Sequence, residues 1–470
     1  MIILSENEQI EIKHGKGTFF SFGVGSMSRE FLLMAFNTFV FFYYEAEVGL
    51  NVWYIGIGLI IFAVYNALND PIVGYLTNRP FKFTKKWGRR FPLILIGGIP
   101  MGFCYFLIFI PPNVDPQTGT GALILFGWFV FVTCLFDTFH TIFFVSWQAL
   151  FPDKFRSQSE RRTSTAYNIL LGIIGVALGA MIPPLLITFG DLQTYIIQGI
   201  AIFLFSLVTM IIAIPGFRED RVTIDRYLES YVKEVKRRSF ISELKLVFKQ
   251  RSFVAFIFVY MMYQTLVVSM TASIPYVVRF ILKLPASATT LLMACLLIGV
   301  IVSTPFWIKL AQKKNDNRKV MLIGAILLGV LLIPMIFIET YELFLISLLI
   351  WGIALGAFWA MIFPVMSDVI DESVVRDGER KEGTLTGIQQ FFGRLGIIFQ
   401  ALSFALAHTL TGFVEGADTQ SASAIWGIHV HLAVVPMVCI LLGAFVFWKW
   451  YDLKPEKVSE NQLRINQLKL

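Results

Sequence analysis

The sequence predicts an all-α membrane protein in which twelve transmembrane helices form two six-helix halves. Of the 470 residues, 56% are hydrophobic and only 15% are charged, so a water-soluble fold would have too little interior to hide this apolar surface. The 46 phenylalanines lie in long runs rather than at the alternating spacing of strands. Twelve runs approach the roughly 20 apolar residues that a helix needs to cross the hydrocarbon core. Lipid is therefore the expected solvent for most of the chain.

The predicted spans fall into two sets of six around a charged stretch. The first set begins near Gly17, Asn51, Phe91, Gly121, Thr163 and Thr194, and the second near Ser252, Ala286, Arg318, Tyr341, Thr384 and Ile425. Residues 217–251 have helical periodicity but no run long enough to span, so we expect a cytoplasmic connector there. This predicts an N-terminal half at 1–216, the connector, a C-terminal half at 252–451 and a cytoplasmic tail at 452–470.

The loop charges predict the orientation. Basic residues, including Arg79, Arg89 and Arg90, fill the connection between the second and third spans, whereas the loops on the opposite side are mainly acidic. By the positive-inside rule both termini are cytoplasmic, in a multi-pass protein of the cell membrane. The net charge of +7 is therefore explained by the basic residues in the cytoplasmic loops, and we expect no nucleic-acid partner.

Little in the sequence predicts a metal site, another cofactor or a cleaved leader. The four cysteines all lie in apolar runs without a CxxC pair, and His429 and His431 would face different sides of a helix. We therefore expect neither a disulfide framework nor a bound metal. The polar start of the chain predicts no cleavable signal peptide.

Charged residues near the middle of spans are the strongest functional signal, because a charge inside the bilayer must be paired or face a cavity. Arg29 and Glu30 lie near the middle of the first span. They are candidates for a charged pair that faces a substrate cavity, and the alternative is a purely structural ion pair.

The second span carries Asn66, Asn69 and Asp70, followed by Pro71. Spacings of three and four residues place the two amides beside the carboxylate on one helix face, where their oxygens could ligate a small hard cation. Alternatively, Asp70 could take up a proton, because burial disfavours its charge. It could also satisfy backbone groups that Pro71 leaves free.

Other polar positions fall in the fourth, tenth and eleventh spans. Asp137, His140, Thr141, Phe144 and Gln148 share one stripe of the fourth span, where Asp137 and His140 could relay a proton or simply join two helices. Later candidates are Trp359, Gln389, Gln390 and Arg394. Arg394 could balance Asp70 or Glu30 across the interface between the halves.

These residues give the chain a resemblance to the glycoside/pentoside/hexuronide:cation symporter family of the major facilitator superfamily. The stretch DVIDESVVRDGERKEG at residues 368–383 resembles the signature of that family most specifically. NDPIVGY at 69–75, GRRFP at 88–92 and WQALFP at 147–152 are further matches in the same order and spacing. The resemblance implies a major facilitator fold with a central substrate site between the halves.

The resemblance also implies roles for individual residues. The resemblance assigns substrate binding to Arg29, Glu30, Trp359 and Gln389, and cation or proton binding to Asp70, Asn66 and Thr141. The polar positions in the spans add His140, Gln148 and Gln390 to the substrate candidates, and Asn69 and Asp137 to the cation or proton candidates. Arg394 stands where the family has a lysine that links the two sites. The candidates for a cytoplasmic gate are Arg79, Arg89, Arg90, Asp368 and Asp371.

Three positions depart from the family pattern. Phe144 replaces a sugar-binding aspartate, Asn168 an arginine and Asn66 a cation-site aspartate. These changes put galactoside specificity in doubt, and the loss of a carboxylate at Asn66 makes a proton a competitor for sodium.

We therefore predict symport of a small organic solute, a sugar or glycoside, coupled to Na⁺ or H⁺ by a monomer in the lipid bilayer. The alternative within the same fold is a lysolipid or other amphiphile as substrate, which Phe144 favours. A membrane enzyme or a non-transporting scaffold fits less well, because we find neither a nucleophile with its base nor a soluble interaction domain.

Overall fold

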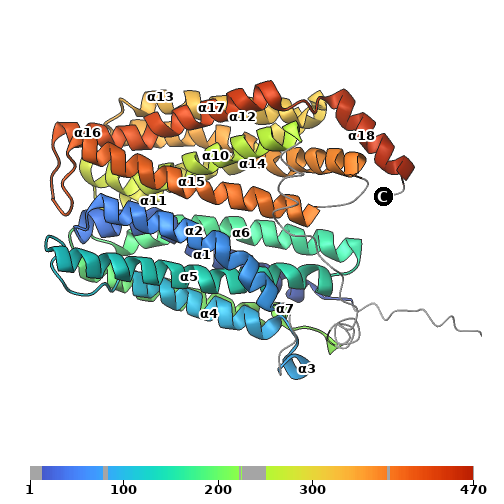
Figure 1. Cartoon of the computed structure of the whole chain (residues 1–470), viewed down its shortest axis with the longest axis horizontal. Helices are drawn as coiled ribbons and strands as arrows, with labels where there is room; N and C mark the ends of the chain where they lie inside the picture. The colour runs from blue at the N-terminus through green and yellow to red at the C-terminus, as the bar shows by residue number, and fades with distance from the viewer. Residues whose placement is uncertain (1–12, 78–82, 222–223, 225–249, 378–381, 469–470) are drawn as a thin grey trace, which may run out of the picture.

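The computed structural model describes residues 13–77, 83–221, 224, 250–377 and 382–468. In that part of the chain the regular structure is helical, and long helices lie side by side in two bundles (Figure 1). The first residues of α1 and the helix α18 lie at one end of the bundles, which we call the terminal face. The opposite end is the far face.

The first bundle is the N-terminal half. It contains α1 (Lys16–Phe42) with the π-helical turn η1 (Tyr43–Glu47), α2 (Val52–Thr77), the short α3 (Thr84–Trp87), α4 (Phe91–Ile108), α5 (Gly119–Lys154), α6 (Gln158–Leu186) and α7 (Leu192–Phe217). Side chains at loop ends start several of these helices. Ser157 caps α6, and Asp191 caps α7 by accepting a hydrogen bond from a backbone amide.

The second bundle is the C-terminal half. It contains α10 (Arg251–Tyr276) with η2 (Val277–Ile281), α11 (Ala288–Lys314), α12 (Asn317–Val330), α13 (Leu332–Met335), α14 (Tyr341–Asp377), α15 (Glu382–Thr411), α16 (Ala422–His429) with η3 (Val430–Val434), α17 (Val435–Trp450) and α18 (Pro455–Leu468). The tail predicted at 452–470 is thus largely a helix. It packs on α14, where Lys457 Nζ lies 2.7 Å from Glu372 Oε1.

The predicted spans agree with these helices, because each predicted start lies within five residues of an observed one. Among the described residues, eleven helical segments are long and apolar enough to cross a membrane. The twelfth span, α1, is also of spanning length but carries Arg29 and Glu30 at its middle. The predicted connector at 217–251 lies almost wholly outside the described residues.

Glycines let helices within each half approach closely. A Cβ at Gly175 of α6 would lie 2.3 Å from the backbone oxygen of Met27 in α1, and one at Gly299 of α11 would lie 2.2 Å from the oxygen of Leu349 in α14. Small residues commonly allow such contacts where lipid gives no hydrophobic drive for helices to associate. Large apolar side chains such as Leu410 instead stay exposed, as a lipid-facing surface requires.

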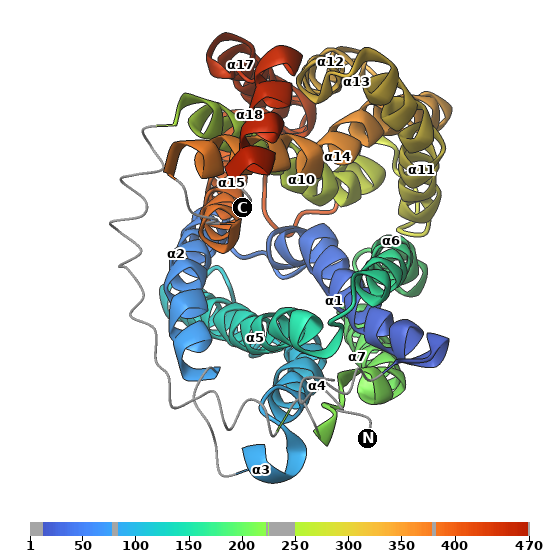
Figure 2. The same cartoon turned by 90° about the vertical axis from the view of Figure 1, so that its right-hand side faces the viewer.

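Among the described residues, the most extensive contacts between the two halves are those of α2 with α15, α6 with α11, and α1 with α10 (Figure 2). Helices α1 and α10 are among the most buried of the structure. The polar residues predicted in the first, second, fourth and eleventh spans therefore meet near this interface.

Candidate functional site

An ion pair joins the two halves. Arg394 of α15 contacts Asp70 of α2 through one carboxylate oxygen, and the other oxygen accepts a hydrogen bond of 2.9 Å from Thr141 of α5. The Arg394 and Asp70 side chains are 20% and 33% exposed. The two charges thus neutralise each other at a place that solvent still reaches. This is the pairing that the sequence offered as one of two choices for Arg394.

A second carboxylate lies beside this pair. Asp137 of α5 is buried and accepts hydrogen bonds from the side-chain amides of Asn66 and Asn69, the latter at 3.2 Å. The side-chain oxygen of Asn66 is also buried and has no hydrogen-bond partner among the described residues. Such an orphaned oxygen is costly unless a ligand or water satisfies it.

This arrangement differs in one respect from the sequence prediction. Asn66 and Asn69 do share the face of α2 that carries Asp70, but their amide nitrogens point to Asp137 on the neighbouring helix. Asp137 therefore supplies the second carboxylate that Asn66 had seemed to remove. Together Asp70, Asp137, Thr141 and the free oxygen of Asn66 form a set of hard oxygen donors, the kind that small hard cations prefer.

A second charged pair lies on α1. Arg29 contacts Glu30, and its Nε donates a hydrogen bond of 3.2 Å to His140 Nε2 on α5. The Arg29 guanidinium also lies 4.3 Å above the Phe144 ring, a cation–π geometry. His140 must accept at Nε2 here, so its ring is neutral with the proton on Nδ1. His140 and Asp137 hydrogen-bond to different partners, and the proton relay between them remains a prediction.

The C-terminal half brings aromatic groups to the same level. Trp359 of α14 donates a hydrogen bond to the hydroxyl of Tyr263 in α10, whose ring stacks on Phe358 at 4.3 Å. The Gln390 side chain is exposed beside the Tyr260 hydroxyl, and Gln389 is buried. Gln148 of α5 is exposed, one turn closer to the terminal face than Phe144. Sequence reasoning named the tryptophan and the glutamines but missed both tyrosines.

Four of the five residues predicted to form a gate lie in the described part of the chain, at the terminal face. Arg89 contacts Asp153 at 3.3 Å, Arg90 donates to the Thr77 carbonyl oxygen at 3.2 Å, and Asp368 accepts a hydrogen bond of 3.2 Å from Asn317. These contacts stay within one half. Asp371 lies on the same end of α14 as Asp368, and Arg79 lies outside the described residues.

At the far face, by contrast, several contacts bridge the halves. Arg279 pairs with Glu47 at 2.8 Å, Trp53 Nε1 donates to Thr409 Oγ1 at 2.9 Å, and Thr290 donates to the Met181 carbonyl oxygen at 3.0 Å. The far face is closed by these bonds.

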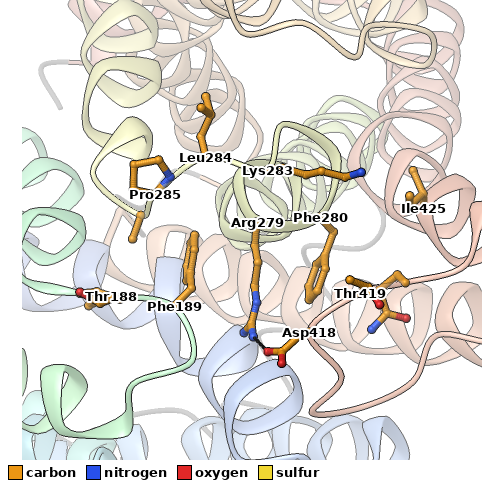
Figure 3. Close-up of a pocket in the computed structure, with 13 residues that line it drawn as sticks. Thr188, Phe189, Arg279, Phe280, Lys283, Leu284, Pro285, Asp418, Thr419 and Ile425 are labelled. Carbon is orange, nitrogen blue, oxygen red and sulfur yellow. Dashed lines mark hydrogen bonds and ion pairs between the residues drawn. The ribbon is translucent and has the colours of Figure 1, made fainter.

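A pocket of about 400 Å³ opens beside the closed contacts. Arg279 and Phe280 project into it from η2, and Asp418 pairs with Arg279 at 3.3 Å while Phe189 comes from the other half (Figure 3). Arg279 is paired with the carboxylates of Glu47 and Asp418, so its charge is already balanced within the protein. Elsewhere among the described residues, no group of three or more His, Cys, Asp or Glu side chains is placed so that it could hold a metal ion.

The fold and the central polar residues define a transporter class, and comparison with known families agrees. Residues 21–454 match the model of the family described as MFS/sugar transport protein. The chain belongs to this family.

Curated relatives and solved structures extend the comparison. The chain is 22% identical to the sodium-dependent lysophosphatidylcholine symporter 1-A of Danio rerio, over 87% of this chain and 80% of that protein. It is 23% identical to the uncharacterized symporter YjmB of Bacillus subtilis, over 94% and 93% of the two chains. The D-xylose-proton symporter (14% identity, 92% and 97% covered) and the nucleoside transporter NupG (11%, 93% and 100%) both share its fold with a TM-score of 0.64.

Proposed function

We propose that the protein is a cation-coupled secondary symporter that moves a small organic solute, a sugar or glycoside, by alternating access. The ion pair between Asp70 and Arg394 carries the proposal. It joins the two halves beside the second carboxylate of Asp137, so one site can respond both to a cation and to the relative position of the halves.

Arg394 provides the means of coupling. In the present state its guanidinium supplies the positive charge that Asp70 needs. A cation that enters among Asp70, Asp137 and Thr141 takes over that role and releases Arg394. The freed arginine can then turn toward substrate, so each ligand strengthens binding of the other by the same factor.

Na⁺ is the coupling ion that we propose. Two carboxylates, a threonine hydroxyl and the unpartnered oxygen of Asn66 supply hard oxygen ligands and enough negative charge for a desolvated monovalent cation. The names of several relatives describe sodium-dependent symporters, which supports the same choice. A proton carried by Asp70 or Asp137 is the competing outcome of the test below.

The substrate site in this proposal lies between Arg29 and Glu30 on one side and Trp359 on the other. Arg29 and Glu30 offer charged groups that can hydrogen-bond hydroxyls, and their side chains are 20% and 30% exposed. Trp359 and Tyr263 offer aromatic faces for the apolar side of a sugar ring. The family description also supports a sugar.

An amphiphile with a charged headgroup is the second candidate substrate. Phe144 covers the Arg29 guanidinium with an aromatic ring where a sugar site would offer an acid. A relative matched over most of its length is described as a lysophosphatidylcholine symporter. In this reading Arg29 meets the phosphate of the headgroup and the aromatic groups meet its cationic end.

We also propose that the terminal face is cytoplasmic and open to water in this state. The basic residues Arg89 and Arg90 lie at that face, as the positive-inside rule requires. The closed far face then faces outward. A monomer suffices, because both halves of the site come from one chain.

Thermal unfolding of the purified protein tests substrate and ion together. Melibiose, a methyl glycoside panel and lysophosphatidylcholine are added with Na⁺, with Li⁺ and with choline at several pH values. We expect stabilisation by one ligand class that increases with Na⁺, and loss of the Na⁺ effect in Asp70→Asn. Asp115→Asn, which removes an exposed loop carboxylate, is the matched control. If stabilisation by the ligand depends on pH but not on Na⁺, the coupling ion is a proton and not sodium.

A further inference from the structure

Two basic residues, Arg279 and Lys283, stand out among the charges of the far face. The loops and π-helical turns of that face are residues 43–51, 109–118, 187–191, 277–287, 336–340 and 412–421. The other charged residues in them are all Asp or Glu. In the orientation proposed above these loops face outward, where the positive-inside rule predicts few basic residues. Topology therefore does not account for Arg279 and Lys283, and both line the pocket of about 400 Å³.

That pocket is built from both halves. Ile187, Thr188 and Phe189 come from the α6–α7 loop of the N-terminal half, and the C-terminal half supplies the rest from η2, the loop after it, the α15–α16 loop and α16. The volume lies within the range of about 300–1,000 Å³ that small-molecule sites occupy. A molecule that fills the pocket while the far face is closed therefore contacts both halves.

The guanidinium of Arg279 is held in place beside the pocket. Arg279 Nη1 lies 2.8 Å from Glu47 Oε1, and the two side chains are only 7% and 2% exposed. The ring centroids of Phe189 and Phe280 lie 5.7 and 5.2 Å from the guanidinium carbon, on either side of it (Figure 3). Glu47 alone balances the charge of Arg279, and Nη2 is left for a second partner.

The second partner is the carboxylate of Asp418, 3.3 Å from Arg279 Nη2. The Asp418 side chain is 91% exposed, so this ion pair is weak in water and its loss costs the protein little. Asp418 shows where an anionic oxygen meets Arg279. A ligand carboxylate that carries an apolar body can displace it, because the body gains contacts with Phe189 and Phe280.

Lys283 adds a cation that has no hydrogen-bond or ion-pair partner among the described residues. Its side chain runs along the pocket toward Ile425 (Figure 3). The Lys283 backbone is left-handed, with φ 53°, where Leu284 N donates to the Val278 carbonyl oxygen and ends η2. Glycine is the usual residue at such a helix end, so a lysine carries strain that glycine would not. What the lysine adds is its amine in the pocket.

We propose that this pocket binds a small amphipathic carboxylate from the far-face side. The carboxylate displaces Asp418 from Arg279 Nη2 and pairs with Lys283, while the apolar body packs against Phe189 and Phe280. Because these two rings belong to different halves, the bound molecule holds the far face closed. The closing effect rests on the alternating access proposed above, whereas the binding itself does not.

A fluorinated probe measures the binding. 4-Fluorophenylacetate joins a carboxylate to one aromatic ring, and broadening of its fluorine NMR line on the purified full-length protein gives its affinity. 4-Fluorophenylacetamide has the same shape without the charge and is the matched ligand. We expect the carboxylate to bind about fivefold or more tightly than the amide, because its contacts to the two cations are charge-assisted. Equal affinities would overturn the proposal.

Lys283→Gly is the decisive variant. It removes the amine and relieves the left-handed strain, so the end of η2 stays intact and the melting temperature should be unchanged or higher. We expect the affinity for 4-fluorophenylacetate to fall about 3- to 10-fold. Lys283→Arg keeps the positive charge and should bind the probe with about the wild-type affinity. A Lys283→Gly protein that binds the probe as well as the wild type overturns the proposal.

Asp418→Asn tests the displacement step. It removes the anion that competes for Arg279, so the probe should bind up to about fivefold more tightly. Asp115→Asn is the matched control, because it removes an exposed carboxylate from another loop of the far face, outside the pocket, and should leave the affinity unchanged. Equal affinities in the two variants would refute the displacement of Asp418.

Pulsed spin-spin distance measurements in nanodiscs test the closing effect. Spin-labelled unnatural amino acids replace Gln193 and Glu342, which are exposed at the far-face starts of α7 and α14. The background is Trp53→Phe, which loses the bridge to Thr409 outside the pocket and so populates the open far face more. At ten times its dissociation constant the carboxylate should raise the closed-to-open ratio by up to about tenfold. A ratio that stays constant overturns the closing effect.

Transport measurements separate this inference from the proposed function. Probe binding is measured without an ion gradient and without a transported substrate. A protein that binds the carboxylate as expected but shows no ion-driven flux refutes the symport proposal alone. A protein that shows ion-driven flux but does not prefer the carboxylate to the amide refutes the pocket ligand alone.

Discussion

Replacing Arg394 with glutamine should strengthen cation binding at the central site. Arg394 and Asp70 form an ion pair whose side chains are 20% and 33% exposed. Two unit charges about 4 Å apart attract by roughly 4 kcal/mol at an effective dielectric constant of about 20. Solvent screening reduces this to about 1–2 kcal/mol for side chains so exposed. A cation must overcome that attraction to reach Asp70, so its removal should raise affinity about 5- to 30-fold.

Isothermal titration of Na⁺ into the purified protein, with choline holding the ionic strength constant, measures this change. Arg394→Lys is the matched control, because it keeps a positive charge near Asp70 and should bind Na⁺ with about the wild-type affinity. Binding of Na⁺ to Arg394→Gln that is unchanged or weaker than wild type would refute competition between the arginine and the cation.

Three further predictions concern the carboxylate, the terminal face and the packing. Asp70→Asn should retain substrate exchange across proteoliposomes but lose accumulation against a gradient, and wild-type accumulation would exclude Asp70 from coupling. The hydrogen bond from His14 to Asp220 raises the pKa of His14, so the stabilising contact is complete below pH 6.5 and is lost as pH rises through that raised value. Hydrogen exchange of the amides at the start of α1 should therefore accelerate more between pH 6.5 and 8.5 in the wild type than in His14→Ala. An acceleration no larger than in the variant would contradict this. Gly175→Ala forces a Cβ against a carbonyl of α1 and should destabilise the protein by about 1–3 kcal/mol in thermal unfolding, whereas Gly74→Ala, which has open space, should not.

The helices themselves could be predicted well because their signal is local. The length of an apolar run and the change from charged loop residues to apolar residues determine where a span begins. The observed helices start within five residues of the predicted positions. The charged pair Arg29 and Glu30 within α1 was also visible, since a charge in an apolar run stands out.

Side-chain partners on different helices could be predicted only in part. The need to balance buried charge left Asp70 and Glu30 as two possible partners of Arg394, and the structure pairs it with Asp70. The hydrogen bonds from the Asn66 and Asn69 amides to Asp137 could not be predicted in the same way. Helical spacing shows that the two residues share a face of α2, but it does not show which residue of α5 lies opposite that face.

The buried contact between Glu45 and His408 at the far face was not predicted. The sequence analysis treated the outer loops only as mainly acidic, whereas Glu45 is fully buried and hydrogen-bonded to a histidine 363 residues away. Neither composition nor periodicity reports which loop-end residues turn inward between the halves. The π-helical turn at Tyr43–Glu47 contributes to this, because it changes the faces that a regular helix would present.

Uptake into proteoliposomes under imposed ion gradients tests the symport proposal most directly. Radiolabelled methyl glycosides and lysophosphatidylcholine are offered separately with an inward Na⁺ gradient, an inward H⁺ gradient or neither. We predict that one of these substrates accumulates above its external concentration under the Na⁺ gradient and that accumulation collapses when the gradient is removed. Flux of the transported substrate that is indifferent to both gradients would contradict cation-coupled symport.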